Sequence, residues 1–570
     1  MLSLLRLQRL WGSYVRPLKR LSGEGKLGVE RLEDRRVLAG NVYVTFSNNT
    51  LTVNGDDLAN SFSITRAGDA VLVSAASGTT LFSHGQKVDL GSRGYGVSDF
   101  SKLAIKINGK GGDDRITVGS TLGETYAHHV LGMKSLTIDT GAGADELNID
   151  SVRINQTGTS KITLGSSSQL DADYFDVNGL YVVGGLDVLM GGGNDYFDFD
   201  SNTNVLRRLL VDLGAGDDSG YIDWGQYGSL NVKLGAGNDY FYTGLESSSF
   251  MPVMVGGDVT FDGGDGDDRL RFNHVDFKSL LSIKTGNGND RVDFEGDLKV
   301  FSTATIDAGH GNNVVTMKKA AFSGALNVNA GTGNDQFTFG GDLSTTYWAT
   351  KINAGSGNNV VNFKKTTLGG ALTVTTGHGN DQIKFDGALS VNGKLTLTTN
   401  GGNDNVTIDS GGTVTGLVDA NFGDGTNTFA IEWLSALGGF KYAGGSGIDT
   451  ILVEDGLAAP TVVAKLGAGN DVVNIDGLAK SSTVAADKVE IDMGAGIDVL
   501  TGSYINVKDA RIKLGAGNDV LSIVSSVISV YAQIDGGSDA DHGYFTGTVP
   551  TRASGKLKIS YFESGNILHI

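Results

Sequence analysis

The chain has 570 residues with a net charge of −19, 86 glycines, four prolines and no cysteine. The lack of cysteine excludes a disulfide framework, a thiolate nucleophile and a thiolate metal ligand. The low proline content excludes a collagen-like chain. The acidic balance argues against nucleic acid as a partner, because an acidic surface repels phosphate and attracts cations.

Residues 1–38 form a basic leader segment, with nine Lys and Arg against four Asp and Glu. The rest of the chain carries 36 basic and 60 acidic residues, a net charge of −24, so the charge changes sign at this boundary. Arg6 and Arg9 interrupt the first leucines, which leaves the apolar run too short for a membrane span. One interpretation of this segment is a disordered or amphipathic arm.

The segment LEDRRVL within residues 32–38 resembles the LEPR-XLL leader found near the start of bacterial secreted and surface proteins. Asp34 stands where that family has proline, and Val37 stands where it has leucine. The resemblance implies export, so we expect a secreted or cell-surface protein, with a cytoplasmic protein as the alternative. The positions that match are Leu32, Glu33, Arg35 and Leu38.

A single template repeats from residue 51 to about residue 545, and Leu281–Phe294, LSIKTGNGNDRVDF, is a clear copy. With Asp290 as position zero, apolar residues stand nine and seven places before it and two and four after it, and glycines stand four and two before it. This pattern predicts a strand, a glycine-cornered turn and a second strand. Most intervals between zero positions are 21 to 24 residues. The zero positions are Asn60, Asp114, Asp145, Asp173, Asp195, Asp218, Asp239, Asp268, Asp290, Asn313, Asp335, Asn359, Asp381, Asp404, Asn427, Asp449, Asp471, Asp498, Asp519 and Asp541.

A unit of this length has only two short apolar faces, so neighbouring units must stack on one another to enclose a core. We therefore predict an all-β fold, a parallel β-helix or solenoid of about twenty coils, with the apolar columns in its interior. The columns two and four places after zero include Val292, Phe294, Phe337, Phe339, Ile383 and Phe385.

The template divides the chain into regions. Residues 39–110 follow it loosely and are predicted to cap the N-terminal end, because the first coil must cover an open edge. Residues 111–545 hold the β-helix repeats, and residues 546–570 are expected to form a C-terminal cap with a last strand at Lys556–Tyr561. Three stretched intervals predict surface loops at Thr121–Leu131, Leu245–Val255 and Leu478–Asp487.

The turn resembles the hemolysin-type (RTX) calcium-binding repeat, in which glycines permit left-handed backbone and an aspartate points into the turn. Gly263–Arg271 (GGDGDDRLR) and Gly444–Leu452 (GGSGIDTIL) match it closely. The family has tandem repeats, whereas each coil here carries one. The resemblance implies bound Ca2+, and the candidate metal ligands are Asp195, Asp218, Asp239, Asp268, Asp290, Asp449, Asp471, Asp498 and Asp519.

The coil spacing also favours a cation. Equivalent aspartates about 4.8 Å apart would form a column, and each neighbouring pair of carboxylates would repel by about 3.5 kcal/mol at an effective dielectric of about 20. A calcium ion between two such carboxylates would offset this repulsion, with turn carbonyls and water completing its shell. Alternatively, each side chain hydrogen-bonds its own turn without metal, which the asparagines at Asn313, Asn359 and Asn427 favour, because stacked amides need no ion.

Opposite charges are expected to pair between coils in the middle of the chain. Lysine pairs follow two of the asparagine turns, and acidic residues occupy the comparable segment of neighbouring coils. We expect these charges to neutralise one another. The residues are Lys318, Lys319, Lys364 and Lys365, with Glu295, Asp297, Asp342 and Asp386.

Parallel β-helices include polysaccharide lyases and hydrolases, and their GHG and RIK motifs occur here around His310, His378 and Arg511. Both histidines occupy the variable slot between repeat glycines, and Arg511 lies six coils beyond His378, or about 29 Å along the axis. We therefore predict no catalytic site. The tandem His128 and His129 fall in the first predicted loop, where solvated histidines are expected.

These observations predict an exported structural or adhesive surface protein that is not an enzyme. The alternatives are a polysaccharide-active β-helix enzyme and a non-catalytic glycan-binding protein, which would use exposed aromatics such as Tyr240 and Tyr242. The expected partners are calcium and either extracellular polysaccharide or other surface proteins, without a membrane span.

Overall fold

A computed structural model describes residues 40–89, 91–119, 130–165, 171–200, 202–244, 252–479, 484–548 and 557–560. Residues Leu38–Ile570 form one compact unit, distinct from Met1–Val37. The basic leader segment with its LEDRRVL match lies outside the described residues. The same holds for most of the first two predicted loops, including His128 and His129, and for part of the third.

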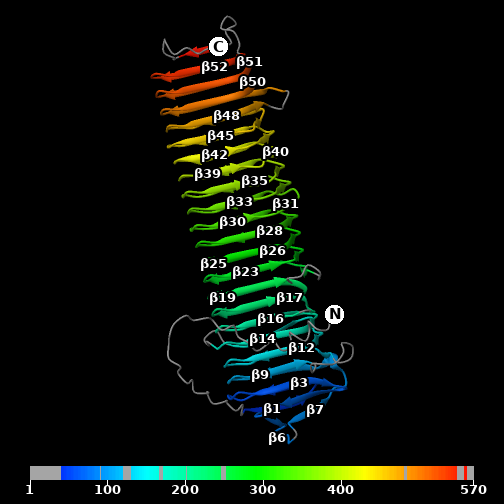
Figure 1. Cartoon of the computed structure of the whole chain (residues 1–570). Helices are drawn as coiled ribbons and strands as arrows, with labels where there is room; N and C mark the ends of the chain where they lie inside the picture. The colour runs from blue at the N-terminus through cyan, green and yellow to red at the C-terminus, as the bar shows by residue number, and fades with distance from the viewer. Residues whose placement is uncertain are drawn as a thin grey trace, which may run out of the picture. The chain divides into compact units, whose positions relative to one another are not determined.

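The unit that begins at Leu38 is a parallel β-solenoid of about 18 turns, with a spacing of about 23 residues (Figure 1). This confirms the predicted fold class. The one helical element among the described residues is the 3-10 turn η1 (Phe100–Lys102). In the part of the chain that the structure describes, no helix is long and apolar enough to cross a membrane.

Each regular coil contributes three strands, and from β29 to β45 every strand pairs in parallel with the strand three places further along the chain. The strands before the turn are β29 (Leu326–Asn329), β32 (Thr350–Asn353), β35 (Leu372–Thr375), β38 (Leu395–Thr398), β41 (Val418–Gly423) and β44 (Phe440–Gly444). The strands after the turn are β30 (Gln336–Phe339), β33 (Val360–Phe363), β36 (Gln382–Phe385), β39 (Asn405–Ile408), β42 (Asn427–Ile431) and β45 (Asp449–Val453). The short third strands are β31 (Leu343–Thr345), β34 (Thr366–Leu368), β37 (Leu389–Val391), β40 (Gly412–Val414), β43 (Leu434–Ala436) and β46 (Leu457–Ala458).

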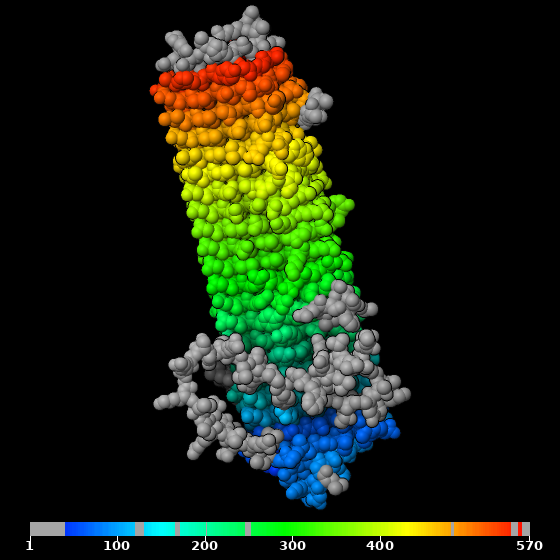
Figure 2. Space-filling model, viewed as in Figure 1, coloured from blue at the N-terminus to red at the C-terminus, as the bar shows by residue number. Residues whose placement is uncertain are grey.

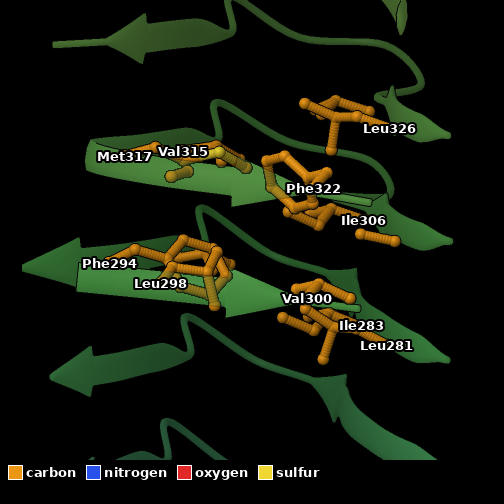
Figure 3. Close-up of a cluster of buried hydrophobic side chains, with 14 of the residues drawn as sticks. Leu281, Ile283, Phe294, Leu298, Val300, Ile306, Val315, Met317, Phe322 and Leu326 are labelled. Carbon is orange, nitrogen blue, oxygen red and sulfur yellow. The ribbon is translucent and has the colours of Figure 1, made fainter. Parts of the chain in front are cut away.

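The alternate side chains of these strands fill the interior. Figure 3 shows apolar side chains from β25 (Leu281–Asn287), β26 (Arg291–Val300), β27 (Ala304–Asp307), β28 (Val314–Phe322) and β29 meeting inside the coils. The rings of Phe339, Phe363 and Phe385 stack from coil to coil, with centroids 4.9 Å apart in both steps. The predicted core columns are confirmed, since Val292, Phe294, Phe337, Phe339, Ile383 and Phe385 are all buried.

The N-terminal end departs from the parallel pattern, in the stretch where the sequence predicts a capping region. All antiparallel pairings of the described strands lie here: β1 (Asn41–Ser47) with β2 (Thr50–Asn54), β3 (Ser61–Ala67) with β4 (Ala70–Ala75), β4 with β7 (Ser92–Gly96), and β5 (Thr80–Ser83) with β6 (Gln86–Lys87). Within this region β1 and β5 already pair in parallel, and the continuous parallel stack starts where β2 meets β8 (Ala104–Asn108) and β3 meets β9 (Arg115–Gly119). At the other end, β53 (Leu557–Ser560) pairs with β51 (Val520–Ser538).

Three ion pairs form between the predicted lysines and acids of the middle coils, whereas Glu295 pairs with Arg271. Lys319 lies 3.1 Å from Asp297, Lys365 lies 2.6 Å from Asp342, and Lys364 pairs with Asp386. Each pair joins two coils. Because all six side chains are at least 39% exposed, solvent screens each pair and its contribution to stability is small.

Candidate functional site

The glycine turn brings coils into unusually close contact. In the turn that ends at Asp268, Gly264 and Gly266 have φ values of 105° and 133°, which residues with a Cβ rarely adopt. A Cβ on Gly264 would lie 1.6 Å from the Gly235 carbonyl oxygen, and one on Gly266 would lie 1.8 Å from that of Gly237. Glycine is therefore required by both the backbone conformation and the space between coils.

The zero residues lie inside the solenoid, directly after these turns. The nine aspartates predicted as metal ligands are brought into one column and are at most 2% exposed. We call the complete set of zero residues the inner column. Its remaining members are Asn60, Asp114, Asp145, Asp173, Asn313, Asp335, Asn359, Asp381, Asp404, Asn427 and Asp541, which are equally buried.

In every inner-column side chain after Asn60, one oxygen accepts a hydrogen bond from the neighbouring coil. The backbone N–H of Asp195 donates to Oδ1 of Asp218 at 2.7 Å, and the N–H of Asp268 donates to Oδ1 of Asp290 at 2.9 Å. This bond recurs at 2.7–3.1 Å from Asn60 to Asn427 and again from Asp449 to Asp541. Between the two series, Nδ2 of Asn427 donates to Oδ1 of Asp449 at 2.9 Å.

The second side-chain atom distinguishes asparagine from aspartate. Nδ2 of Asn313 donates to the carbonyl oxygens of Gly309 and Gly311 at 3.4 and 3.2 Å, and Nδ2 of Asn359 bonds its own turn in the same way. In the aspartate coils Oδ2 is buried without a hydrogen-bond partner. This holds for Asp114, Asp145, Asp173, Asp195, Asp218, Asp239, Asp268, Asp290, Asp335, Asp381, Asp404, Asp449, Asp471, Asp498 and Asp519.

A second column of Asn and Asp runs outside the first, one residue earlier in each turn. The N–H of Asn238 donates to Oδ1 of Asp217 at 2.8 Å, in the direction opposite to the inner bonds. We call this exposed set the outer column. It comprises Asn194, Asp217, Asn238, Asp267, Asn289, Asn312, Asn334, Asn358, Asn380 and Asn403, each of which accepts the N–H of the same position in the next coil.

Burial disfavours the charged form of the inner carboxyls. It raises the pKa of Asp114, Asp173, Asp218 and Asp268 to about 8, that of Asp145 and Asp471 to about 7, and that of Asp195, Asp239, Asp335 and Asp498 to about 6. Burial also raises the pKa of Asp290, Asp381, Asp404, Asp449 and Asp519. Neighbouring carboxyls add to the shift at Asp218 and Asp268.

The inner column offers a poor shell for calcium, which takes about six to eight oxygens, some from water. Oδ2 is closed off from solvent, and in the asparagine coils the atom at this position donates to its own turn's carbonyls instead. The described residues contain no group of three or more His, Asp or Glu placed to hold a metal ion. The residues present therefore do not fit a hydrated divalent ion, and calcium binding remains a prediction from the sequence.

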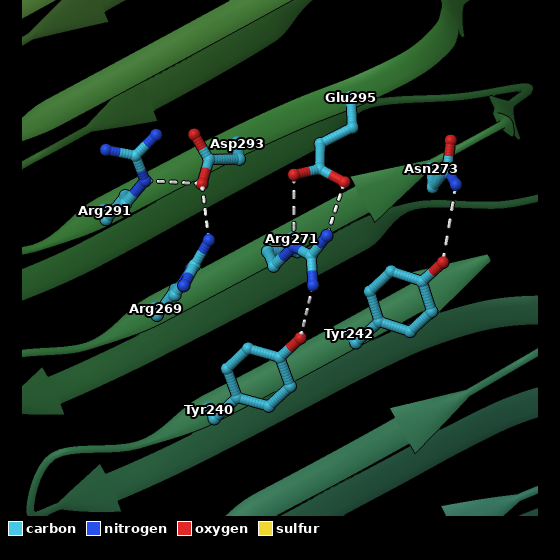
Figure 4. A network of polar contacts seen from close by, with 8 residues as sticks. All are labelled: Tyr240, Tyr242, Arg269, Arg271, Asn273, Arg291, Asp293 and Glu295. Carbon is cyan, nitrogen blue, oxygen red and sulfur yellow. Dashed lines mark hydrogen bonds and ion pairs between the residues drawn. The ribbon is translucent and has the colours of Figure 1, made fainter. Parts of the chain in front are cut away.

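The two tyrosines considered for glycan stacking have their rings occupied. Tyr242 is buried, and the Arg271 guanidinium lies over its ring. Tyr240 lies against the ring of Tyr221, and its hydroxyl accepts a hydrogen bond from Arg271 at 2.9 Å. Arg271 also donates two bonds to Glu295, as Figure 4 shows. Tyr242 is therefore closed to a sugar ring, and the half-buried Tyr240 ring is in contact with Tyr221.

The GHG and RIK motifs remain apart. His310 lies exposed in its turn, with Nδ1 3.1 Å from Oγ1 of Thr332, and His378 occupies the same slot three coils later. Arg511 belongs to β50 (Val499–Ala516), six coils beyond His378. The face seen in Figure 2 presents closely stacked coils.

The inward direction of the zero residues is the feature that our sequence reasoning missed. Asp290 is separated from Val292 and Phe294 by two and four residues, so alternation along the strand already predicts that all three side chains lie on the core face.

Comparison of the chain with protein-family models, with curated proteins and with solved structures found no match.

Proposed function

We propose that the protein is an exported structural or adhesive surface protein, in which the β-solenoid serves as a stiff spacer. The observation that carries this proposal is the continuity of the stack. Each regular coil is tied to the next by three paired strands and by the inner column, and the outer column adds a bond at each step from Asn194 to Thr426. About 18 turns at about 4.8 Å each give a stack roughly 85 Å long.

The chemistry of the column also supports a structural role. The turn residues, which in an enzyme would face a substrate, here point inside or bond to the next coil. Side chains committed to coil-to-coil bonds are suited to holding a repeat stack together, because a solenoid depends on interfaces between neighbouring units.

Export rests on the leader resemblance and on the change of charge after residue 38. The experiment is to express the epitope-tagged chain in its source cells, label intact cells with antibody and fractionate them. A matched variant carries residues 32–38 in scrambled order. We expect the native chain at the surface or in the medium, and the scrambled variant inside. Full-length native chain confined to the cytoplasm would refute the proposal.

A further inference from the structure

We propose that the inner column is a ladder of neutral carboxylic acids. In each aspartate coil the proton resides on Oδ2 and is donated to a carbonyl of the same turn, at the position where the turn motif suggests a cation.

The asparagines of the column indicate which chemistry this position requires. Asn313 and Asp290 use Oδ1 in the same way, each accepting the N–H of the preceding coil. The other atom of Asn313 is a donor to two turn carbonyls. An ionised carboxylate has no donor and would place a charged oxygen against those carbonyls, whereas a protonated acid has an O–H to donate. Only the neutral aspartate reproduces the asparagine contacts.

Oδ2 packs closely against the glycines of its own turn. A Cβ on Gly263 would lie 2.5 Å from Oδ2 of Asp268, and one on Gly444 would lie 1.8 Å from Oδ2 of Asp449. The carboxyl therefore packs directly on its own turn. Its Oδ2 is closed to solvent, so water cannot supply the missing hydrogen bond.

The charged groups that most affect the column supply no positive charge. Asp218 faces Asp195 and Asp239 in the column, and Asp268 faces Asp239 and Asp290. At Asp449 the facing groups also include the Tyr442 hydroxyl. The remaining charged groups are carboxyls at the rim of the turns: Asp56, Asp113, Asp171, Asp217, Asp267, Asp424 and Asp539. Mutual repulsion within such a set favours the neutral form.

The ladder makes stability depend on pH in a definite direction. An unfolded aspartate titrates at about 3.9, and burial raises the pKa of Asp218 and Asp268 to about 8. The folded chain therefore binds more protons than the unfolded chain between these values. The stabilisation is complete below the unfolded pKa and is lost as pH rises through the folded pKa. The melting temperature should therefore fall from pH 5 to pH 9.

The test compares two double variants that carry the same pair of Asp→Asn substitutions at neighbouring positions. Asp218→Asn with Asp268→Asn gives the inner column permanent donors, whereas Asp217→Asn with Asp267→Asn alters the exposed outer column one residue away. Thermal unfolding is followed at several pH values between 5 and 9, with a calcium chelator and with added calcium. The infrared band of protonated carboxylic acid is measured at pH 6 on wild type and on both variants.

We expect the inner variant to melt near the wild-type temperature at pH 5 and above it at pH 9, with a weaker acid band and no response to calcium. The outer variant should keep the acid band and the fall in melting temperature from pH 5 to pH 9, because it retains both inner carboxyls. The proposal is overturned if wild type shows no acid band, if both variants share one pH dependence, or if calcium stabilises wild type and the inner variant loses that effect. The infrared measurement on wild type shows whether protonated carboxylic acid is present, even where a variant folds poorly.

Discussion

Replacing Gly266 by alanine should lower the free energy of unfolding by about 4 kcal/mol or more, which is exceptional for a single methyl group. The new Cβ would lie 1.8 Å from the Gly237 carbonyl oxygen, and the φ of 133° would itself be strained. The coils cannot separate at this turn without breaking the N–H bond from Asp239 to Asp268. Denaturant unfolding of the purified chain measures the effect.

The matched control is Gly340→Ala, also within the regular coils. A Cβ there would meet its nearest atoms at 3.7 and 3.9 Å, which is ordinary contact, and its φ lies outside the left-handed region. We expect a change below about 1 kcal/mol. Equal losses at Gly266 and Gly340 would show that the turns do not approach as closely as described.

Replacing Phe363 by alanine should cost about 3 to 5 kcal/mol. Its side chain is fully buried and stacks between Phe339 and Phe385, so truncation leaves a cavity between two rings that cannot close onto each other. Unfolding of the variant in denaturant gives the value. Tyr347→Ala is the control, because Tyr347 is 82% exposed and its loss should cost no more than about 0.5 kcal/mol. A small effect at Phe363 would contradict the ring stack.

The period of the sequence predicted the parts of the fold that depend on spacing. Phe363 and its stacked neighbours follow from apolar residues at fixed offsets, and the pairing of Lys319 with Asp297 follows from opposite charges one coil apart. These contacts need only the repeat length, because a parallel stack places equivalent positions over one another.

The environment of the aspartates was harder to predict. The calcium interpretation placed an ion between carboxylates of adjacent coils, with turn carbonyls and water completing its shell, whereas Asp290 is 1% exposed and bonded to the neighbouring coil. The sequence did contain a signal for the direction of the Asp290 side chain: Val292 lies two residues later, so alternation along the strand places both side chains on the core face. The protonation state of the inner column cannot be predicted from residue spacing, because it depends on how closely Oδ2 packs against the turn.

The most direct test of the ladder is native-state hydrogen exchange of the inner-column amides, measured at pH 6 and pH 9 with calcium and with a chelator. Exchange reports the local opening of each coil and is corrected for its intrinsic dependence on pH. The ladder predicts equal protection with calcium and with chelator at pH 6. At pH 9 protection should be lost in the aspartate series from Asp195 to Asp290 before it is lost around Asn313 and Asn359. Chelator-induced opening of the series Asp195–Asp290 and Asp449–Asp541 at pH 6 would contradict the account and favour bound calcium.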